Sequence, residues 1–282
     1  MTGKPFVKWV GGKSRLIHQL DSLLPKNLNN YTYIEPFVGG GAMLFHILEK
    51  YNIKNAVIND LNSSLINTYN VIRDDVSNLM SSLKNLQDYY NDLVNIEDKQ
   101  ALYYEIRDKF NHSGYLSKLE SAVYFIFLNK TTFNGLYREN SSGLFNAPFG
   151  KKQKINLYDS DNLKNISKLL SKVTILNGDY VETMTYATEP STFFYLDPPY
   201  RQVFNGFTKT GYDDSEQLRL KEFCDNINKS GYLFMQSNSK CIDGFFENHY
   251  KDYKIHEVEI HRNIGAKRES RGIVKEIVIC NY

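Results

Sequence analysis

The strongest constraint on the fold is an apolar run that stops at two prolines. Phe193–Leu196 contains only aromatic and aliphatic residues, and Asp197, Pro198, Pro199 and Tyr200 follow it directly. Such a run is typical of a buried strand, and the proline pair predicts that the strand ends there. In open α/β sheets, ligands bind at the carboxyl ends of strands. This turn, called the DPPY turn after its four residues, is therefore the first candidate site.

The DPPY turn offers hydrogen-bond acceptors beside an aromatic ring. Proline has no backbone N–H, so the turn presents a carboxylate and carbonyl oxygens. The combination suits an exocyclic amino group on a nucleobase: Asp197 and the Pro198 carbonyl would accept its two N–H groups, and Tyr200 would stack on the base. The alternative is a proline-capped strand end with a packed tyrosine, because short motifs recur by chance.

A glycine-rich turn forms the second motif. A short strand pattern at 33–35 leads into Gly39, Gly40 and Gly41, and a helical pattern follows at 43–48. Glycines let a cofactor approach the backbone and leave the amides at the start of the helix free. Asp60 ends the next predicted strand, where an acidic residue binds ribose hydroxyls in nucleotide-binding half-sheets. The alternative for Asp60 is a helix cap.

Five blocks follow one another along the chain in a recognisable order. They are FVKWVGGK at Phe6–Lys13, PFVGGGA at Pro36–Ala42, NGLYREN at Asn134–Asn140, FNAPFG at Phe145–Gly150 and NIGAKRESRG at Asn263–Gly272. Together with the DPPY turn, they resemble the DNA adenine methylase (Dam-like) family of S-adenosylmethionine-dependent methyltransferases. The last block resembles the end of restriction-system members of that family that modify GATC.

This resemblance implies an α/β fold: a Rossmann-like S-adenosylmethionine-dependent methyltransferase domain with an inserted helical DNA-recognition lobe and a β-hairpin. It implies methyl transfer from S-adenosyl-L-methionine to adenine N6 in double-stranded DNA after base flipping. The expected site is GATC or a sequence containing it, within a restriction-modification system. Many relatives continue the hairpin with Arg-Tyr-Lys, whereas this chain has Lys151, Lys152 and Gln153. A base or phosphate contact that those relatives make on this side of the hairpin is therefore not expected in the same form here.

The same resemblance implies roles for individual residues. The expected catalytic residues are Asp197, Pro198, Pro199 and Tyr200. The expected cofactor contacts are Trp9, Lys13, Phe37, Gly39, Gly41, Asp60, Asp179 and Asp197. The expected DNA contacts are Lys8, Phe133, Leu136, Arg138 and Pro148. Arg138 is the candidate for two hydrogen bonds to a guanine in the major groove. Phe133 either wedges between bases or anchors the hairpin, and Asp179 either binds the adenine amine of the cofactor or only forms a turn.

The order of predicted elements divides the chain into two parts. Residues 1–62 and 151–282 alternate between helix and strand patterns and are expected to form the catalytic domain. Residues 63–150 are expected to form an insertion of long amphipathic helices, followed by an exposed β-hairpin at 131–150. Further strands are expected at 173–176, 193–196, 233–236, 253–261 and 274–280, with the last two antiparallel and the basic segment between them.

The composition of the chain excludes few classes of fold or function. The chain has 282 residues, enough for one large α/β domain with an inserted lobe, and its net charge is only +2. Basic residues gather at 262–271 and 151–154, where they suit phosphate contacts. Three widely spaced cysteines give no disulfide or zinc pattern, and no apolar run is long enough to span a membrane. We therefore expect a cytoplasmic protein that needs no metal, and nothing in the sequence requires a dimer.

Two other interpretations remain open. One is methyl transfer to a different amine, such as cytosine N4 or a glutamine amide, although Asp rather than Ser or Asn precedes Pro-Pro-Tyr here. The other is a DNA-binding protein that has kept the fold without the activity, although Asp197, Asp60 and the glycine turn are all intact.

Overall fold

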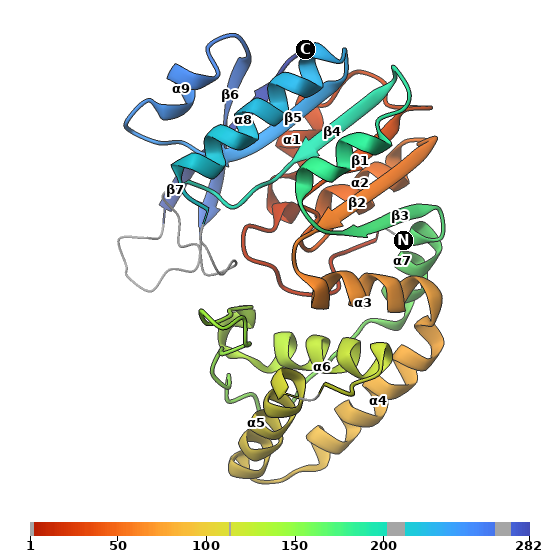
Figure 1. Ribbon diagram of the computed structural model, residues 1–282. Helices are drawn as coiled ribbons and strands as arrows, with labels where there is room; N and C mark the ends of the chain where they lie inside the picture. The colour runs from red at the N-terminus through yellow and green to blue at the C-terminus, as the bar shows by residue number, and fades with distance from the viewer. Residues whose placement is uncertain (1–2, 113, 202–211, 263–271) are drawn as a thin grey trace.

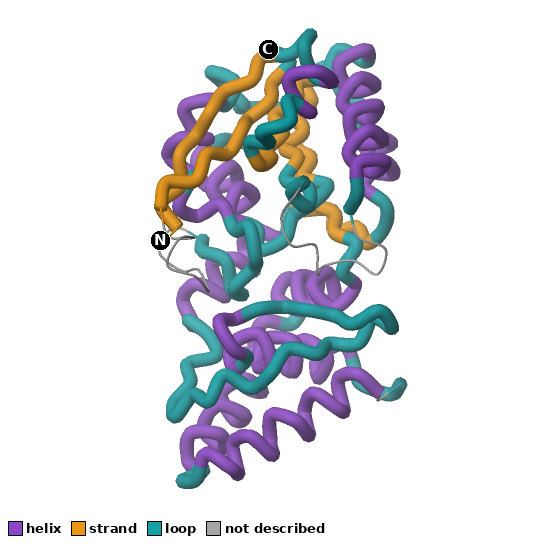
Figure 2. Tube along the Cα trace, turned by 90° about the vertical axis from the view of Figure 1, so that its left-hand side faces the viewer, coloured by secondary structure: helices purple, strands orange, loops and turns teal. Residues whose placement is uncertain are grey.

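The structure is a computed structural model that describes residues 3–112, 114–201, 212–262 and 272–282 (Figure 1). The basic segment 263–271, which holds most of the predicted tail match, lies outside the described residues. A part that contains a β-sheet is stacked on a part made mainly of helices (Figures 1 and 2).

Seven strands of the described chain form one sheet in the order β3-β2-β1-β4-β5-β7-β6. The strands from β3 to β5 are parallel, and β7 is antiparallel to both β5 and β6. The α/β class and the antiparallel closing pair are thus confirmed. The strands are β1 (Thr32–Glu35), β2 (Asn55–Asp60), β3 (Val173–Asn177), β4 (Thr192–Leu196), β5 (Leu233–Ser239), β6 (Lys254–Arg262) and β7 (Gly272–Cys280).

The order of the strands reverses between β1 and β4. From β1 the chain moves outward to β2 and β3, then returns to β4 on the other side of β1 and continues to β5. Thr32 pairs with Thr192, and Ile34 pairs with Phe194. Open α/β sheets bind ligands at such a switch point, beyond the carboxyl ends of the two strands.

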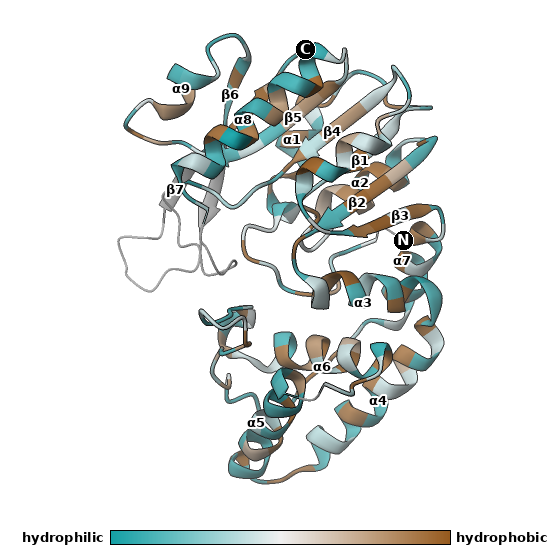
Figure 3. Ribbon diagram, in the orientation of Figure 1, coloured by the Kyte–Doolittle hydropathy of each residue, from teal (hydrophilic) through white to brown (hydrophobic). Residues whose placement is uncertain are grey.

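Helices cover both faces of the sheet. Side chains alternate along each strand, so Tyr33 and Phe193 belong to one buried cluster and Ile34 and Phe194 to the other. The middle strands therefore carry apolar residues along much of their length (Figure 3). The first cluster includes residues of α1 (Ile17–Leu23), α2 (Ala42–Lys50) and α7 (Ser160–Leu170), and the second includes residues of α8 (Asp214–Lys229) and α9 (Phe245–His249).

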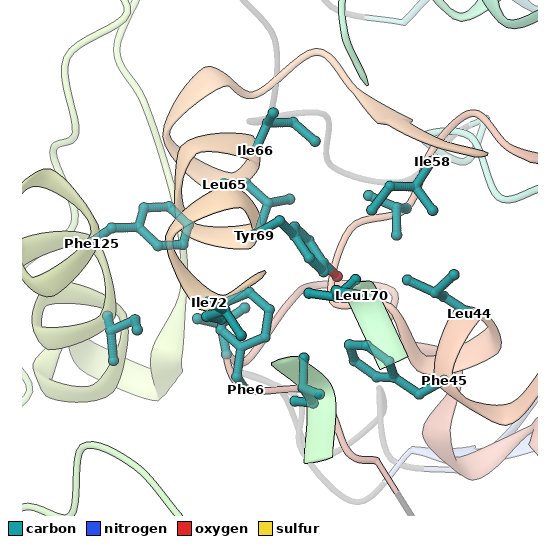
Figure 4. Packing of buried hydrophobic residues seen from close by; sticks show 14 of the residues in the cluster. Phe6, Leu44, Phe45, Ile58, Leu65, Ile66, Tyr69, Ile72, Phe125 and Leu170 are labelled. Atoms are coloured by element: carbon teal, nitrogen blue, oxygen red, sulfur yellow. The ribbon is translucent and has the colours of Figure 1, made fainter. Parts of the chain in front are cut away.

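The helical part shares a core with the sheet part. Helix α3 packs on α6 on one side and on α7 and β3 on the other. The ring of Tyr69 in α3 meets the ring of Phe6 edge-on, with 5.0 Å between ring centres. Figure 4 shows Tyr69 on the side of α3 toward Phe45, and Leu65 between Tyr69 and Phe125 of α6. The four helices of this part are α3 (Ser63–Asp74), α4 (Val76–Asp92), α5 (Ile96–His112) and α6 (Lys118–Thr131).

The predicted hairpin runs antiparallel, but it is not a regular, fully exposed β-hairpin. Its bridges are isolated: Thr132 pairs with Phe149, and Glu139 pairs with Phe145. Phe145 and Phe149 are buried. The side chain of Asn111 in α5 bonds both the N–H and the carbonyl of Phe145, at 2.9 Å each. Backbone hydrogen bonds also cross the segment, from the Asn140 N–H to the Leu144 carbonyl and from the Asn146 N–H to the Arg138 carbonyl, at 2.9 Å each. The segment is therefore an antiparallel hairpin in which Phe145 and Phe149 are buried rather than exposed.

No helix within the described ranges is long and apolar enough to cross a membrane. Within the same ranges, no group of His, Cys, Asp and Glu side chains is arranged to hold a metal ion.

Candidate active site

The two sequence motifs meet at the carboxyl ends of β1 and β4. Glu35 is the last residue of β1, and Leu196 is the last residue of β4. Because these strands are parallel neighbours, the glycine turn that follows β1 lies beside the DPPY turn that follows β4. All five residues of β4 are buried, which confirms that the DPPY turn ends a buried strand.

The glycine turn has a backbone that excludes side chains. Gly39 and Gly41 have φ values of 47° and 75°, in the left-handed region that glycine adopts at little cost. A Cβ on Gly39 would lie 2.7 Å from Cδ1 of Trp9, and one on Gly41 would lie 2.5 Å from the hydroxyl of Tyr69. The Tyr69 hydroxyl also donates to the Gly39 carbonyl at 2.9 Å. Trp9 and Tyr69 therefore pack directly against the backbone of the turn at the start of α2.

Asp60 bonds the glycine turn from the end of β2. Its Oδ2 accepts from the Gly39 N–H at 3.0 Å, and its Oδ1 accepts from the Asn62 N–H at 2.9 Å. Burial raises the pKa of Asp60, while these backbone N–H groups oppose the rise. The alternative that Asp60 caps a helix is wrong, because the side chain of Asn62 caps α3 by accepting from the Leu65 N–H.

Asp197 forms an ion pair with a buried lysine. Nζ of Lys13 lies 2.8 Å from Oδ1 of Asp197, and the two side chains are 3% and 19% exposed. The same Nζ donates to the Gly11 carbonyl at 2.6 Å and lies 4.6 Å from the centre of the Tyr200 ring. Burial raises the pKa of Asp197 to about 6, and the charge of Lys13 limits that rise.

A hydrogen bond to β7 holds the side chain of Tyr200 in place. Its hydroxyl donates to Oε2 of Glu276 at 2.7 Å. Glu276 lies in β7 and is 5% exposed. The sequence analysis gave Glu276 no role, although an acidic residue beside the apolar run Ile277–Cys280 was a usable signal. The hydrogen bond fixes the plane in which the Tyr200 ring meets a ligand.

The two proline carbonyls have different surroundings. Gln217 of α8 donates to the Pro199 carbonyl at 3.1 Å, and Asn238 of β5 donates to Gln217 at 3.1 Å. No residue of the described chain donates a hydrogen bond to the Pro198 carbonyl. The Asp197 carboxylate and the Pro198 carbonyl are thus adjacent acceptors of the DPPY turn that can take part in binding a ligand.

Glu35 is a buried carboxyl group at the end of β1, within the electrostatic influence of Asp197 and Asp60. It is 2% exposed, and its Oε2 accepts from the Tyr33 hydroxyl at 2.7 Å. Burial raises the pKa of Glu35 well above its usual value, and the charges of Asp197 and Asp60 add to the rise. The sequence analysis placed Glu35 at the end of the strand pattern 33–35 and gave it no role. Its place at the end of a buried strand was the available signal.

Asp179 and Phe37 lie on the side of the site where β2 and β3 end. Oδ1 of Asp179 accepts from the Val181 N–H at 3.0 Å, and Oδ2 forms an ion pair with Arg219 at 2.8 Å. Phe37 packs on Tyr180 with 5.0 Å between ring centres. Oδ1 of Asp179 thus caps the short helix that follows β3, and lone pairs remain on both carboxylate oxygens for a ligand.

Lys8 and Trp9 join the glycine turn to the predicted hairpin. The Trp9 ring stacks on Tyr137, with 5.3 Å between ring centres and 27° between planes. The Lys8 side chain lies so close to Gly135 that a Cβ would not fit there. The Lys8 N–H donates to Asn129 at 2.9 Å, and the Asn129 amide donates back to the Lys8 carbonyl at 2.8 Å. Trp9 therefore contacts both the glycine turn, through Gly39, and the hairpin segment, through Tyr137.

The other predicted DNA contacts lie on the hairpin segment itself. Phe133 is 59% exposed, and its N–H donates to the carbonyl of Pro148, which is also exposed. Leu136 is half-buried. The Arg138 guanidinium donates to the side-chain and backbone oxygens of Asn146, at 2.7 and 3.1 Å. These bonds fix the guanidinium and leave further N–H groups for a ligand.

Comparisons with known proteins agree with this geometry. Residues 9–264 match the family described as D12 class N6 adenine-specific DNA methyltransferase. The chain is similar, at 41% identity over 100% of both chains, to a protein of Methanocaldococcus jannaschii named Type II methyltransferase M.MjaIII. It is 34% identical to Type II methyltransferase M1.LlaDCHI of Lactococcus lactis subsp. cremoris, over 99% of this chain and 95% of that protein. It is 30% identical to the DNA adenine methylase of Haemophilus influenzae, over 98% of this chain and 92% of that protein. The chain belongs to the D12 class N6 adenine-specific DNA methyltransferase family.

Proposed function

We propose that this enzyme methylates adenine N6 within a short palindromic site that contains GATC, as the modification enzyme of a type II restriction-modification system. Two similar proteins carry type II names, and the hairpin segment resembles those of GATC-modifying relatives. The observation that carries the proposal is the pair of acceptors, Asp197 and the Pro198 carbonyl, beside the anchored Tyr200 ring. One subunit suffices, because each strand of a palindrome can be modified in a separate visit.

The proposed roles address the weak nucleophilicity of adenine N6, whose lone pair is delocalised into the ring. Asp197 and the Pro198 carbonyl accept the two N–H groups of the amine, which orients N6. They would also stabilise the positive charge that N6 gains as it takes the methyl group and the bond from that group to the cofactor sulfur breaks, and the surplus N–H proton would pass through Asp197 to solvent. Tyr200 stacks on the base, and Glu276 keeps the ring of Tyr200 in position.

The residues around the glycine turn fit S-adenosylmethionine. Gly39 and Gly41 belong to the turn that leads into the start of α2 beside the DPPY turn, and each carboxylate oxygen of Asp60 keeps a lone pair for a ribose hydroxyl. When bound, this cofactor supplies a methyl group carried on a positively charged sulfur. The other residues that we assign to it are Trp9, Lys13, Phe37 and Asp179.

The target base must leave the duplex to reach the acceptors. The Asp197 side chain is only 19% exposed, and a stacked base cannot approach a carboxylate at the bottom of a protein site. Flipping costs about a few kcal/mol, which contacts from the recognition segment offset. Exposed Phe133 suits a wedge in the gap that the base leaves.

We assign residues 63–150 to recognition of the DNA sequence, and residues 1–62 and 151–282 to catalysis.

Arg138→Ala should cost about 1–3 kcal/mol at one base pair and relax selectivity there, because two hydrogen bonds to one guanine are lost. The measurement is turnover on a series of duplexes that are changed one base pair at a time. The matched control is Lys151→Ala, an exposed lysine next to the same segment, which should weaken binding to all duplexes alike and reduce its salt dependence. Equal losses on every duplex for Arg138→Ala would instead indicate a phosphate contact.

Glu276→Ala should raise the activation free energy of methyl transfer by about 1.5–3 kcal/mol, the usual value of a hydrogen bond to a charged group. Glu276→Gln, which can still accept from the Tyr200 hydroxyl, should retain most of the rate. The measurement is the single-turnover rate on saturating DNA. In a Tyr200→Phe background the same bond is already absent, so Glu276→Ala should add little. Fully additive effects of the two substitutions would show that Glu276 acts elsewhere.

A further inference from the structure

Lys13 occupies the position that the proposed mechanism gives to the target amine. Its Nζ is a nitrogen with N–H donors, 2.8 Å from the Asp197 carboxylate and 4.6 Å from the centre of the Tyr200 ring. An adenine amine that donates to Asp197 while its base stacks on Tyr200 would compete with this ammonium for the carboxylate and for the space beside the ring. We propose that Lys13 holds the place of the target amine before the base enters, and leaves Asp197 when the base arrives. This inference rests on the proposed role of Asp197 as an acceptor.

The ion pair has a clear reason to form before the base binds. A buried ammonium or carboxylate is costly unless it is paired, and Lys13 is 3% exposed. Asp197 faces acidic or neutral groups apart from this lysine, and Lys13 is the cation among them in the described part of the chain. These groups are Glu276, Glu35, Tyr200, Tyr195 and Tyr33. Without Lys13, their charges and the burial of the site would favour protonated Asp197, which carries no negative charge to stabilise the amine and whose hydroxyl donates instead of accepting.

The lysine can leave without a rearrangement of the fold. Its four-carbon stem is flexible, so Nζ can move while the backbone stays in place. The residues before it are Gly11, with φ of 77°, and Gly12, and both are exposed. The backbone of the short helix at Lys13–Arg15 contributes no bond to Asp197. Exchange of the ammonium for the amine therefore replaces one donor by another at the same carboxylate.

Removal of Lys13 should affect two pH profiles of the enzyme differently. The profile of kcat/KM reports groups of the free enzyme, and the profile of the single-turnover rate on saturating DNA reports groups of the complex. Loss of Lys13 should raise the pKa of Asp197 in the free enzyme, because an opposite charge within a few ångströms lowers a carboxyl pKa by about 1–3 units. In the complex Lys13 has already left Asp197, so its removal should not change that profile.

The experiment compares wild type, Lys13→Gln and the control Lys4→Gln between pH 5 and pH 9. We expect the acid limb of kcat/KM to move to higher pH by about 1–3 units in Lys13→Gln, while the acid limb of the saturated single-turnover rate stays in place. Lys4 is exposed and lies in the same N-terminal segment, and its substitution should move neither limb. If Lys13→Gln does not fold, Lys13→Met, which keeps an apolar stem of similar length, is measured in the same way.

Two results would overturn the inference. An unchanged kcat/KM limb in the Lys13 variant would show that Lys13 does not keep Asp197 ionised. Equal shifts of both limbs would show that Lys13 stays on Asp197 in the complex and does not hold the place of the amine. Either result leaves the proposed function standing, because that function fails only if the enzyme modifies another base or site, or if Asp197 itself proves dispensable.

Discussion

Replacing Asp197 with alanine should lower the rate of methyl transfer by about a hundredfold or more, the loss typical of removing an aligned polar group from a transition state. Asp197 is the charged acceptor of the DPPY turn, and the carbonyl that remains at Pro198 cannot orient both N–H groups of the amine. The measurement is the single-turnover rate on DNA that carries the modified site. A rate near that of wild type would contradict the catalytic assignment.

Two controls separate this chemistry from the fold. Asp161→Ala removes an exposed carboxylate on α7 and should leave the rate unchanged. Asp197→Ala also leaves the buried ammonium of Lys13 without its carboxylate, so urea unfolding of the variant is measured beside wild type. A folded variant with a lost rate supports the assignment, whereas lost rate in a fully unfolded variant would require the comparison to be repeated with Asp197→Asn, which preserves the shape.

Replacing Asp60 with alanine should weaken S-adenosylmethionine binding by about 1–3 kcal/mol. The carboxylate is expected to hold the ribose hydroxyls, and it also bonds the N–H groups of Gly39 and Asn62. Its loss therefore removes a ligand contact and loosens the glycine turn. Calorimetric titration with the cofactor measures the effect, and DNA affinity should stay close to that of wild type.

Asp60→Asn is the matched variant for this position. The amide keeps one oxygen acceptor at nearly the same shape, so its cofactor affinity should fall between those of wild type and Asp60→Ala. Unchanged cofactor affinity in Asp60→Ala would rule out the ribose contact. An equal fall in DNA affinity would place the role of Asp60 in the fold of the turn instead.

The sequence predicted the parts of the site that depend on local pattern. The strand before the DPPY turn, the glycine turn before α2 and the position of Asp60 at the end of β2 each follow from residues that are adjacent in the chain. The closing pair β6 and β7 was also predictable, because both strands carry clear patterns. These features rest on backbone preferences and burial, which act over a few residues.

The contacts between distant segments were not predictable in this way. The pairing of Lys13 with Asp197 and of Tyr200 with Glu276 depends on the strand order, which places β4 between β1 and β5 and β7 beside β5. The burial of Phe145 in the hairpin segment, whose two backbone groups both bond Asn111 of α5, was not predictable either. Such tertiary partners leave no local pattern in a single sequence, so a structure is needed to find them.

The most direct test of the account maps modified bases in DNA from cells that express either wild type or Asp197→Ala. We expect N6-methyladenine at one short palindromic site containing GATC with wild type, and a strongly reduced level of the same modification with the variant. A palindrome without GATC would change the specificity alone. Methylated cytosine with wild type, or equal adenine methylation with the variant, would contradict the claim that this site transfers a methyl group to adenine N6 through Asp197.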